Sequence, residues 1–254
     1  MYRNQYDDSV TTYSPVGRLH QVEYAMEAVK QGSAVCGLRS KTTAVLAAFR
    51  RTSSDLGSPQ QKLFRIDAHM GIGVSGLIAD ARGLSVYMRG EALNHQYLYG
   101  SNIPIVRIAS KVSDKSQVYT QKATKRPYGV GLLVVGVDRT GAHLFETSPC
   151  GLHYEYVAQA LGARSQSAKT YLEKYYESFD DASDDDLILH AIKSLRGSSP
   201  TGEITADNVE IGIVSTTRPF TVLEREELER YITRANADGQ GGPRPSSTDA
   251  MQED

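Results

Sequence analysis

SPVGRLHQVEYAMEAVKQG, at residues 14–32, predicts a turn followed by one amphipathic helix. Pro15 and Gly17 are typical of the turn, and Ser14 is expected to cap the helix. Gly32 stands where a left-handed C-terminal cap is expected. One helical face carries apolar side chains at spacings of three and four: Leu19, Val22, Ala25, Met26 and Val29. A helix therefore precedes the first strand of the domain.

After this helix the pattern changes to short apolar runs typical of strands. Strands are predicted at 33–38, 43–49, 62–67, 70–75, 128–137, 143–147 and 209–215. Helices are predicted at 79–99, around 113–123, and at 165–178, 184–195 and 223–234. This order favours a layered domain with a helix pair on each side of stacked sheets.

Composition limits the class of protein. The 254 residues are 40% hydrophobic and 23% charged, which suits one domain with a sizeable core. The formal net charge of −2 argues against a general polyanion binder. Two cysteines without a CxxC motif fit a reducing compartment, and neither a secretory signal nor a membrane span is apparent. We therefore expect a soluble protein of the cytoplasm and nucleus, with no membrane partner.

The helix and the residues before it resemble the alpha subunits of the proteasome core particle. The shared signature is close to YD…T.FSP.GRL.QVEYA, with Tyr13 in place of the usual Phe. Further motifs of these subunits match at 30–33, 76–82 and 126–129. The opening MYRNQYD, together with YAMEAVKQGS at 24–33, is most similar to the paralogue at the sixth position of the eukaryotic alpha ring.

The resemblance implies an α+β fold of the Ntn-hydrolase type. That fold is a four-layer αββα sandwich, here with an extra N-terminal helix across its top. It also implies seven-membered rings in which alpha rings cap beta rings. The expected partners are neighbouring alpha and beta subunits and the regulatory particle or other activators. Residues 1–13 are expected to form a gate segment, 14–235 the domain, and 236–254 a disordered tail.

A catalytic role is not expected. The related catalytic subunits use an N-terminal threonine whose free amine moves the proton, helped by an acid and a lysine. Here the first strand begins at Ser33, inside a continuous chain, and the acid position falls at Phe49. Lys62 is expected near the position of the lysine, but it lacks these partners. The alternative is an active N-terminal-nucleophile amidohydrolase of the same fold, which would require cleavage before Ser33.

The resemblance instead implies two sets of site residues in a non-catalytic ring subunit. One set would hold the open gate over the central pore: Tyr6, Asp7, Pro15 and Tyr24. The other would line a pocket between adjacent subunits that receives the C-terminal tail of an activator: Lys62, Leu19, Glu23 and Gly32. The lysine would pair with the carboxylate of the tail.

Other patterns predict no further chemistry, and no cofactor or metal is expected. GIGVSG at 71–76 matches a dinucleotide fingerprint, but it lies on a predicted strand and indicates close sheet packing. The acidic run at 180–186 precedes a helix and is interpreted as capping. A nucleic-acid role is weakly indicated by five basic residues, for which a solvated or subunit-contacting face is favoured. These residues are Lys111, Lys115, Lys122, Lys125 and Arg126.

Overall fold

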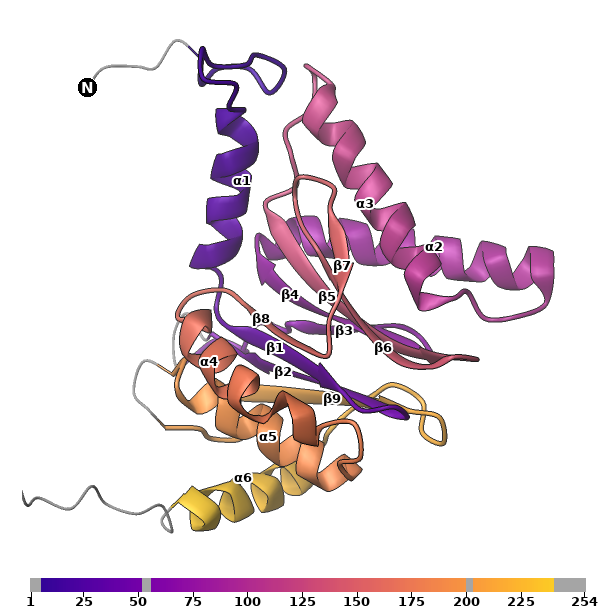
Figure 1. The fold of residues 1–254 in the computed structure, drawn as a ribbon, viewed down its shortest axis with the longest axis vertical. Helices are drawn as coiled ribbons and strands as arrows, with labels where there is room; N and C mark the ends of the chain where they lie inside the picture. Colours follow the sequence, from indigo (N-terminus) through magenta and orange to yellow (C-terminus); the bar gives the residue numbers. More distant parts are fainter. Residues whose placement is uncertain (1–5, 52–55, 200–202, 240–254) are drawn as a thin grey trace, which may run out of the picture.

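Two five-stranded antiparallel sheets stack face to face, with helices on both outer faces (Figure 1). The computed structural model describes residues 6–51, 56–199 and 203–239. The first sheet, in the order β10-β9-β2-β1-β8, contains β1 (Val35–Arg39), β2 (Thr43–Phe49), β8 (Ala158–Leu161), β9 (Val209–Ser215) and β10 (Thr221–Val222). The second, in the order β3-β4-β5-β6-β7, contains β3 (Leu63–Asp67), β4 (Met70–Gly76), β5 (Val130–Asp138), β6 (Gly141–Thr147) and β7 (His153–Glu155).

The helices divide between the two sheets. The second sheet is covered by α2 (Ile78–Tyr99) and α3 (Ile105–Gln121). The first is covered by α4 (Ser165–Tyr175) and α5 (Asp184–Arg196), with α6 (Arg225–Gly239) packed beside α5 and a 3-10 turn at Tyr176–Ser178. The remaining helix, α1 (His20–Gln31), contacts β4 and β5 at one end of the sandwich (Figure 1). This is the four-layer fold that the sequence predicted, with its extra N-terminal helix.

Period-two alternation along the strands produces three apolar cores in these four layers. In β2, Val45 and Ala47 pack toward α4 and α5, whereas Leu46 and Ala48 pack between the sheets. The strand β5 alternates in the same way between the core under α2 and α3 and the core between the sheets. Because both faces of β2 and of most of β5 are covered, these strands are largely apolar rather than alternately polar.

Glycines on β4 allow the two sheets to approach closely. A Cβ on Gly73 would lie 2.7 Å from the Cγ2 of Val35, and a Cβ on Gly71 would overlap the ring of Phe220. Both contacts would clash, because real Cβ atoms essentially never approach other atoms so closely. The GIGVSG run therefore serves sheet packing, as the sequence indicated, and its glycines lie on a strand rather than at the start of a helix.

The seat of α1 is made by small residues at the ends of β4 and β5. Val22, Ala25 and Val29 form its buried face. A Cβ on Gly131 would lie 2.8 Å from the Cγ1 of Val29, so this glycine makes room for the helix. The Ser75 hydroxyl donates to the Val29 carbonyl oxygen at 2.9 Å and satisfies a helix-terminal acceptor.

Both ends of α1 differ from the sequence expectation. Ser14 does not cap the helix, whose N-cap is Leu19. Its hydroxyl accepts from the Arg18 amide at 3.0 Å and closes the preceding turn. Gly32 is extended, at φ −61° and ψ 154°, rather than left-handed. Glycine is required there for space, because a Cβ would overlap Ser75 and Gly76.

Sequence reasoning misplaced the start of one helix and missed three short strands. The helix α3 begins at Ile105, directly after Pro104, and not near 113. The strands β7, β8 and β10 contain three, four and two residues, too few for a periodic signal. At the C-terminus α6 continues to Gly239, so the predicted tail begins inside a helix. Residues 1–5 of the predicted gate segment and 240–254 of the tail lie outside the described residues.

The contact between Val29 and Gly131 predicts a compensating pair of substitutions. Gly131→Ala alone should destabilise the seat of α1 by about 1–3 kcal/mol through overpacking, and Val29→Ala alone by about 2 kcal/mol. The double variant should cost less than the sum, because removing the Val29 methyl groups makes room for the new one. Hydrogen exchange of the α1 amides in the assembled protein measures each effect.

Val22→Ala combined with Gly131→Ala is the matched control, because the atoms nearest to a Cβ on Gly131 belong to Val29 and Leu161 and not to Val22; in this pair the two costs should add. Additive costs in the double variant of Val29 and Gly131 would show that these two residues do not share one packing contact.

Candidate functional site

The junction between α1 and β1 brings Ser33 and Lys62 into contact. The Lys62 ammonium nitrogen lies 2.7 Å from both the backbone oxygen and the hydroxyl oxygen of Ser33. The Ser33 hydroxyl donates to the Phe49 carbonyl oxygen at 2.9 Å. Lys62 is therefore beside Ser33, which the sequence analysis placed at the start of the first strand but which lies two residues before β1 begins at Val35. The Phe49 side chain packs in the core. Because the Ser33 nitrogen is an amide and no acid replaces Phe49, this junction lacks the groups of an N-terminal nucleophile.

Burial controls the charge of Lys62, which is only 2% exposed. Burial first, and then the positive charge of Arg51, lower the pKa of Lys62 to about 7, while Glu210 opposes the shift. Glu210 is itself buried, and one of its carboxylate oxygens accepts from the backbone amides of Lys62 and Leu63 at 3.1 and 3.0 Å. This acid fixes the start of β3. Sequence reasoning missed Glu210, although a lone acid inside the apolar run VEIGIVS was a signal.

A pocket of about 220 Å³ adjoins Lys62. It is lined by Ala28, Gln31, Gly32, Ser33, Arg51, Gln60, Lys62, Gly76, Leu77 and Ile78. Two of the four residues predicted for an activator pocket, Lys62 and Gly32, therefore lie together. The other two, Leu19 and Glu23, lie toward the opposite end of α1; Leu19 is about 20 Å from Gly32 at 1.5 Å per residue. The Glu23 carboxylate is bound there by the Arg18 guanidinium at 2.7 and 2.6 Å.

The predicted gate residues gather at the N-terminal end of α1. A hydrogen bond from the Tyr24 hydroxyl to the Asp7 carboxylate raises the pKa of Tyr24. The Gln21 amide donates to the Asp7 carbonyl oxygen. Tyr6 precedes this anchor and is half-buried, whereas Pro15 lies exposed in the turn between Ser14 and Arg18. One oxygen of the Asp7 carboxylate, Oδ1, is buried without a partner among the described residues.

Two of the further sequence motifs, 76–82 and 126–129, bind each other. The Arg126 guanidinium makes a bidentate pair with the Asp80 carboxylate at 2.6 and 2.7 Å. Asp80 also accepts from the Gly129 amide at 3.0 Å, while Leu77 donates to the Gly129 carbonyl oxygen at 2.8 Å. The Arg126 bond lowers the pKa of Asp80. These contacts join the start of α2 to the start of β5.

The basic residues considered for nucleic acid are largely engaged within the chain. Lys111 pairs with Glu91 at 2.5 Å, and the Lys115 ammonium lies 4.2 Å from the centre of the Tyr87 ring. Arg126 is held by Asp80, as described above. This arrangement favours structural roles for these cations.

The acidic run at 180–186 is explained by local structure, as the sequence indicated. Ser183 is the N-cap of α5, and its hydroxyl accepts from the Asp186 amide at 3.2 Å. Asp184 accepts from the Thr43 hydroxyl at 2.6 Å, and Asp185 accepts from the Tyr231 hydroxyl at 2.6 Å. The carboxylates thus lie at a helix N-terminus, where they are favoured.

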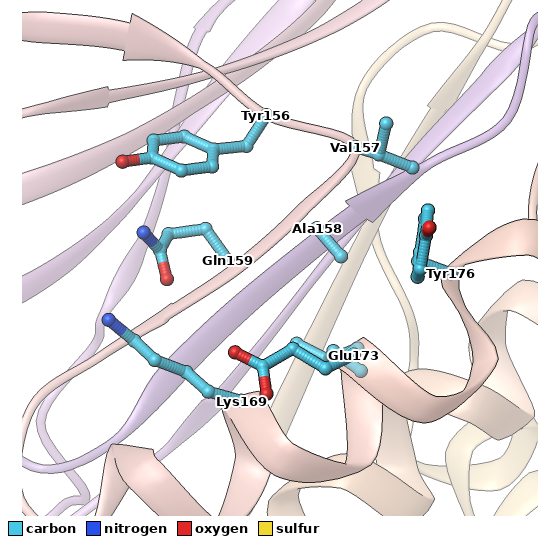
Figure 2. A pocket seen from close by; sticks show the side chains of 8 residues that line it. Tyr156, Val157, Ala158, Gln159, Lys169, Glu173 and Tyr176 are labelled. Carbon is cyan, nitrogen blue, oxygen red and sulfur yellow. The ribbon is translucent and has the colours of Figure 1, made fainter.

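A second hollow, of about 310 Å³, lies between the edge strand β8 and α4 (Figure 2). Lys169 and Glu173 extend from α4 on one side, and Gln159 and Ala158 of β8 lie on the other (Figure 2).

Within the described ranges no three or more His, Cys, Asp and Glu side chains are arranged to hold a metal ion. In the same ranges, no helix combines the length and apolarity needed to cross a bilayer.

Comparison with known proteins identifies two family profiles along the chain. The profile for the N-terminal signature of A-type proteasome subunits matches residues 6–28, and the profile for the proteasome subunit family matches residues 29–214. The alpha type-1 proteasome subunit of Dictyostelium discoideum is 52% identical over 91% of this chain and 94% of the relative. The probable alpha type-6 proteasome subunit of Schizosaccharomyces pombe is 47% identical over 99% and 93%. The alpha type-1 proteasome subunit of Drosophila melanogaster is 44% identical over 96% and 89%.

The Asp7–Tyr24 contact predicts that one hydroxyl anchors the N-terminal segment. Tyr24→Phe should increase amide exchange across residues 6–10 several-fold in the assembled protein, because the segment loses its bond to α1. Tyr13→Phe, at an exposed position of the same segment, is the matched control and should leave the exchange unchanged. Equal exchange in the two variants would remove the anchoring role of Tyr24.

Proposed function

The chain belongs to the proteasome subunit family as an alpha-type, non-catalytic member of the outer ring, and we propose that it also helps to gate the pore and dock activators. These roles would serve ubiquitin-dependent and ubiquitin-independent protein degradation. The observation that carries the proposal is the seat of α1, which occupies one end of the sandwich and leaves Ser33 inside a continuous chain. Mass spectrometry of the mature N-terminus tests whether the chain is non-catalytic. Cleavage exposing Ser33 would favour the alternative, an amidohydrolase of the same fold.

The gate role is supported by the anchor around Asp7. The Tyr24 hydroxyl and the Gln21 amide hold this residue against α1, so the segment before it starts from a fixed point. The Asp7 carboxylate keeps one buried oxygen without a partner among the described residues. Such a group is costly unless it is hydrogen-bonded. We propose that a neighbouring subunit supplies its partner and that Tyr6 and Pro15 complete the cluster over the pore.

The docking role is supported by the separation of two half-sites along α1. Lys62 and Gly32 lie at its C-terminal end, while Leu19 and Glu23 lie at its N-terminal end. A ring built by rotation brings unlike faces of adjacent subunits together. We propose that each complete pocket joins the Lys62 half of one subunit to the Leu19 half of the next. The carboxylate at the end of an activator tail would then bind the lysine, whether the activator is the regulatory particle or another.

Assembly with other subunits is supported by an exposed apolar face of α2. Leu93 is 72% exposed and Tyr97 is 86% exposed. They continue a row that begins at Gly83, Val86 and Gly90, and neither glycine has an atom within 4 Å of its Cβ position. Apolar side chains beside open glycines leave a surface that another helix can approach. We propose that another subunit of the particle covers it.

Ring position and location are further proposals. The sixth position rests on the likeness of 1–7 and 24–33 to the paralogue found there, while the relatives are named as alpha type-1 and alpha type-6. Locating the chain in a reconstituted ring tests the position.

We also propose residence in the cytoplasm and nucleus. This proposal is supported by the two cysteines, Cys36 and Cys150, which are unbridged as a reducing compartment requires. Microscopy of the tagged chain tests the location.

The gate proposal predicts a selective loss of stimulated activity. Tyr6→Ala and Asp7→Ala should each lower activator-stimulated peptide hydrolysis by assembled particles about twofold, because a weaker cluster favours the closed gate. The effect should be no larger, because the other subunits of the ring also stabilise the open gate. Asp8→Ala is the neighbouring control. Unchanged stimulation in both gate variants, alone and combined, would remove the role.

The α2 proposal predicts an assembly defect in a folded chain. Leu93→Asp should reduce incorporation into particles about tenfold, because a charge would be buried at the interface. The fold itself should change by no more than about 0.5 kcal/mol, since Leu93 is exposed in the single chain. Asn94→Asp adds the same charge one position along and is the control; native electrophoresis measures incorporation.

A further inference from the structure

Two hydrogen bonds of the Lys62 side-chain nitrogen are made to Ser33, so a ligand can use only the third position of this nitrogen. The Ser33 hydroxyl proton is donated to the Phe49 carbonyl oxygen at 2.9 Å, so toward Lys62 this hydroxyl can only accept. The Ser33 carbonyl oxygen also only accepts. Lys62 therefore donates two N–H groups whatever its charge. Its third position carries an N–H in the ammonium form and a lone pair in the neutral amine.

The pocket that Lys62 lines suits an anion. Arg51 brings a permanent positive charge to its wall, and Gln60 contributes an amide. The described residues that line it include no carboxylate. The acid near Lys62, Glu210, is already bound by two backbone amides and lies 3.6 Å from the Arg50 guanidinium. The pocket therefore offers a negative ligand two cations and no competing acid among those residues. The Glu23 carboxylate that the other half-site would bring is already paired with the Arg18 guanidinium of its own chain at 2.7 and 2.6 Å.

Without a bound ligand, the charge of Lys62 depends on pH. Burial and Arg51 lower its pKa to about 7, so the ammonium and the amine are both populated near neutral pH. Arg51 and Glu210 are the charged groups that act on it. The walls from α1, β4 and α2 present uncharged side chains or glycine: Ala28, Gln31, Gly76, Leu77 and Ile78. A bound carboxylate would favour the ammonium form and raise the pKa.

We propose that this pocket is a proton-linked carboxylate site, at which a chain end carrying a free carboxylate binds Lys62 and Arg51 and takes up one proton from solvent. The inference rests on the proposed docking role and specifies the charge chemistry of that same site. Arg51 would provide the attraction that is present at every pH, and Lys62 the part that depends on pH. Docking would therefore strengthen as the surroundings become more acidic through neutral pH.

Linkage sets the sign and size of the effect. Below about pH 7 Lys62 is already charged, so binding takes up no proton and the affinity is full. Above about pH 7 each pH unit should lower the affinity by up to about tenfold, giving roughly a 25-fold loss between pH 6.5 and 8.5. Arg51→Ala should weaken binding below pH 7 and also move the loss to higher pH, because Arg51 lowers the pKa of Lys62.

The test uses assembled particles and reads Lys62 by itself. Lysines are acylated with acetic anhydride across a range of pH, and the modified peptides are quantified by mass spectrometry. The acylation rate of Lys62 should level off above about pH 8, whereas that of a free lysine reference peptide in the same solution, with a pKa of about 10.4, should still rise. The measurement is repeated with a short peptide carrying the C-terminal sequence of an activator subunit, and with its C-terminal amide.

The outcomes separate the two proposals. A Lys62 midpoint near pH 7 that the free-carboxylate peptide raises, and the amide does not, supports both. If Lys62 titrates with the free lysine reference peptide while the free-carboxylate peptide still protects it, docking stands and the proton linkage is overturned. If neither peptide changes the midpoint or rate of Lys62, docking at this pocket fails and the linkage with it. An unchanged midpoint in Arg51→Ala would contradict the part assigned to Arg51.

Discussion

The seat of α1 on the ends of β4 and β5 is the contact on which the rest of the structure depends. Gly131 makes space for Val29, and Ser75 binds the Val29 carbonyl oxygen where the helix ends. With α1 in this place, Gly32 must pass close to Ser75 and Gly76, and the chain enters β1 without a free terminus. The same helix presents Tyr24 and Gln21 to Asp7 at its other end. One packing contact thus positions both candidate sites and removes the conditions for terminal-nucleophile chemistry.

The sequence predicted the layers well because burial on both faces leaves a strong mark. Strands such as β2 and β5 are largely apolar, and two-sided burial is the physical reason. What it could not supply was information held in three dimensions. Nothing in the local pattern of Gly32 distinguishes a left-handed cap from a close approach to Ser75, since glycine permits both. The short strand β8 has no periodic signal and is defined by its partner β1.

The candidate site was also only partly predictable from the sequence. Lys62 was assigned from its motif position. Its contact with Ser33 depends on the stacking of the two sheets, because Lys62 directly precedes β3 of one sheet and Ser33 precedes β1 of the other. Arg51 had no signal, because it lies after a strand in a polar stretch and acts only through its distance from Lys62. Glu210 had a signal, an acid in a buried strand, but its role in holding the start of β3 required the fold. The motif position of Lys62 therefore indicated where the candidate site lies, while the charged groups that shift the pKa of Lys62 were identified only from the fold.

The lack of terminal-nucleophile chemistry and the pH-dependent charge of Lys62 both arise at the junction between α1 and β1. A nucleophile at Ser33 would need a free amine, yet α1 runs through Gln31 and Gly32 directly into Ser33, so this nitrogen is an amide. Lys62 lies beside Ser33 at the same junction and is buried there, and burial disfavours its ammonium form. The Ser33 hydroxyl could not use the amine as a base in this arrangement, because its proton is directed at the Phe49 carbonyl oxygen. The junction that excludes terminal-nucleophile chemistry therefore holds a buried amine in the lining of a pocket, and such a group responds to an incoming negative charge by taking up a proton.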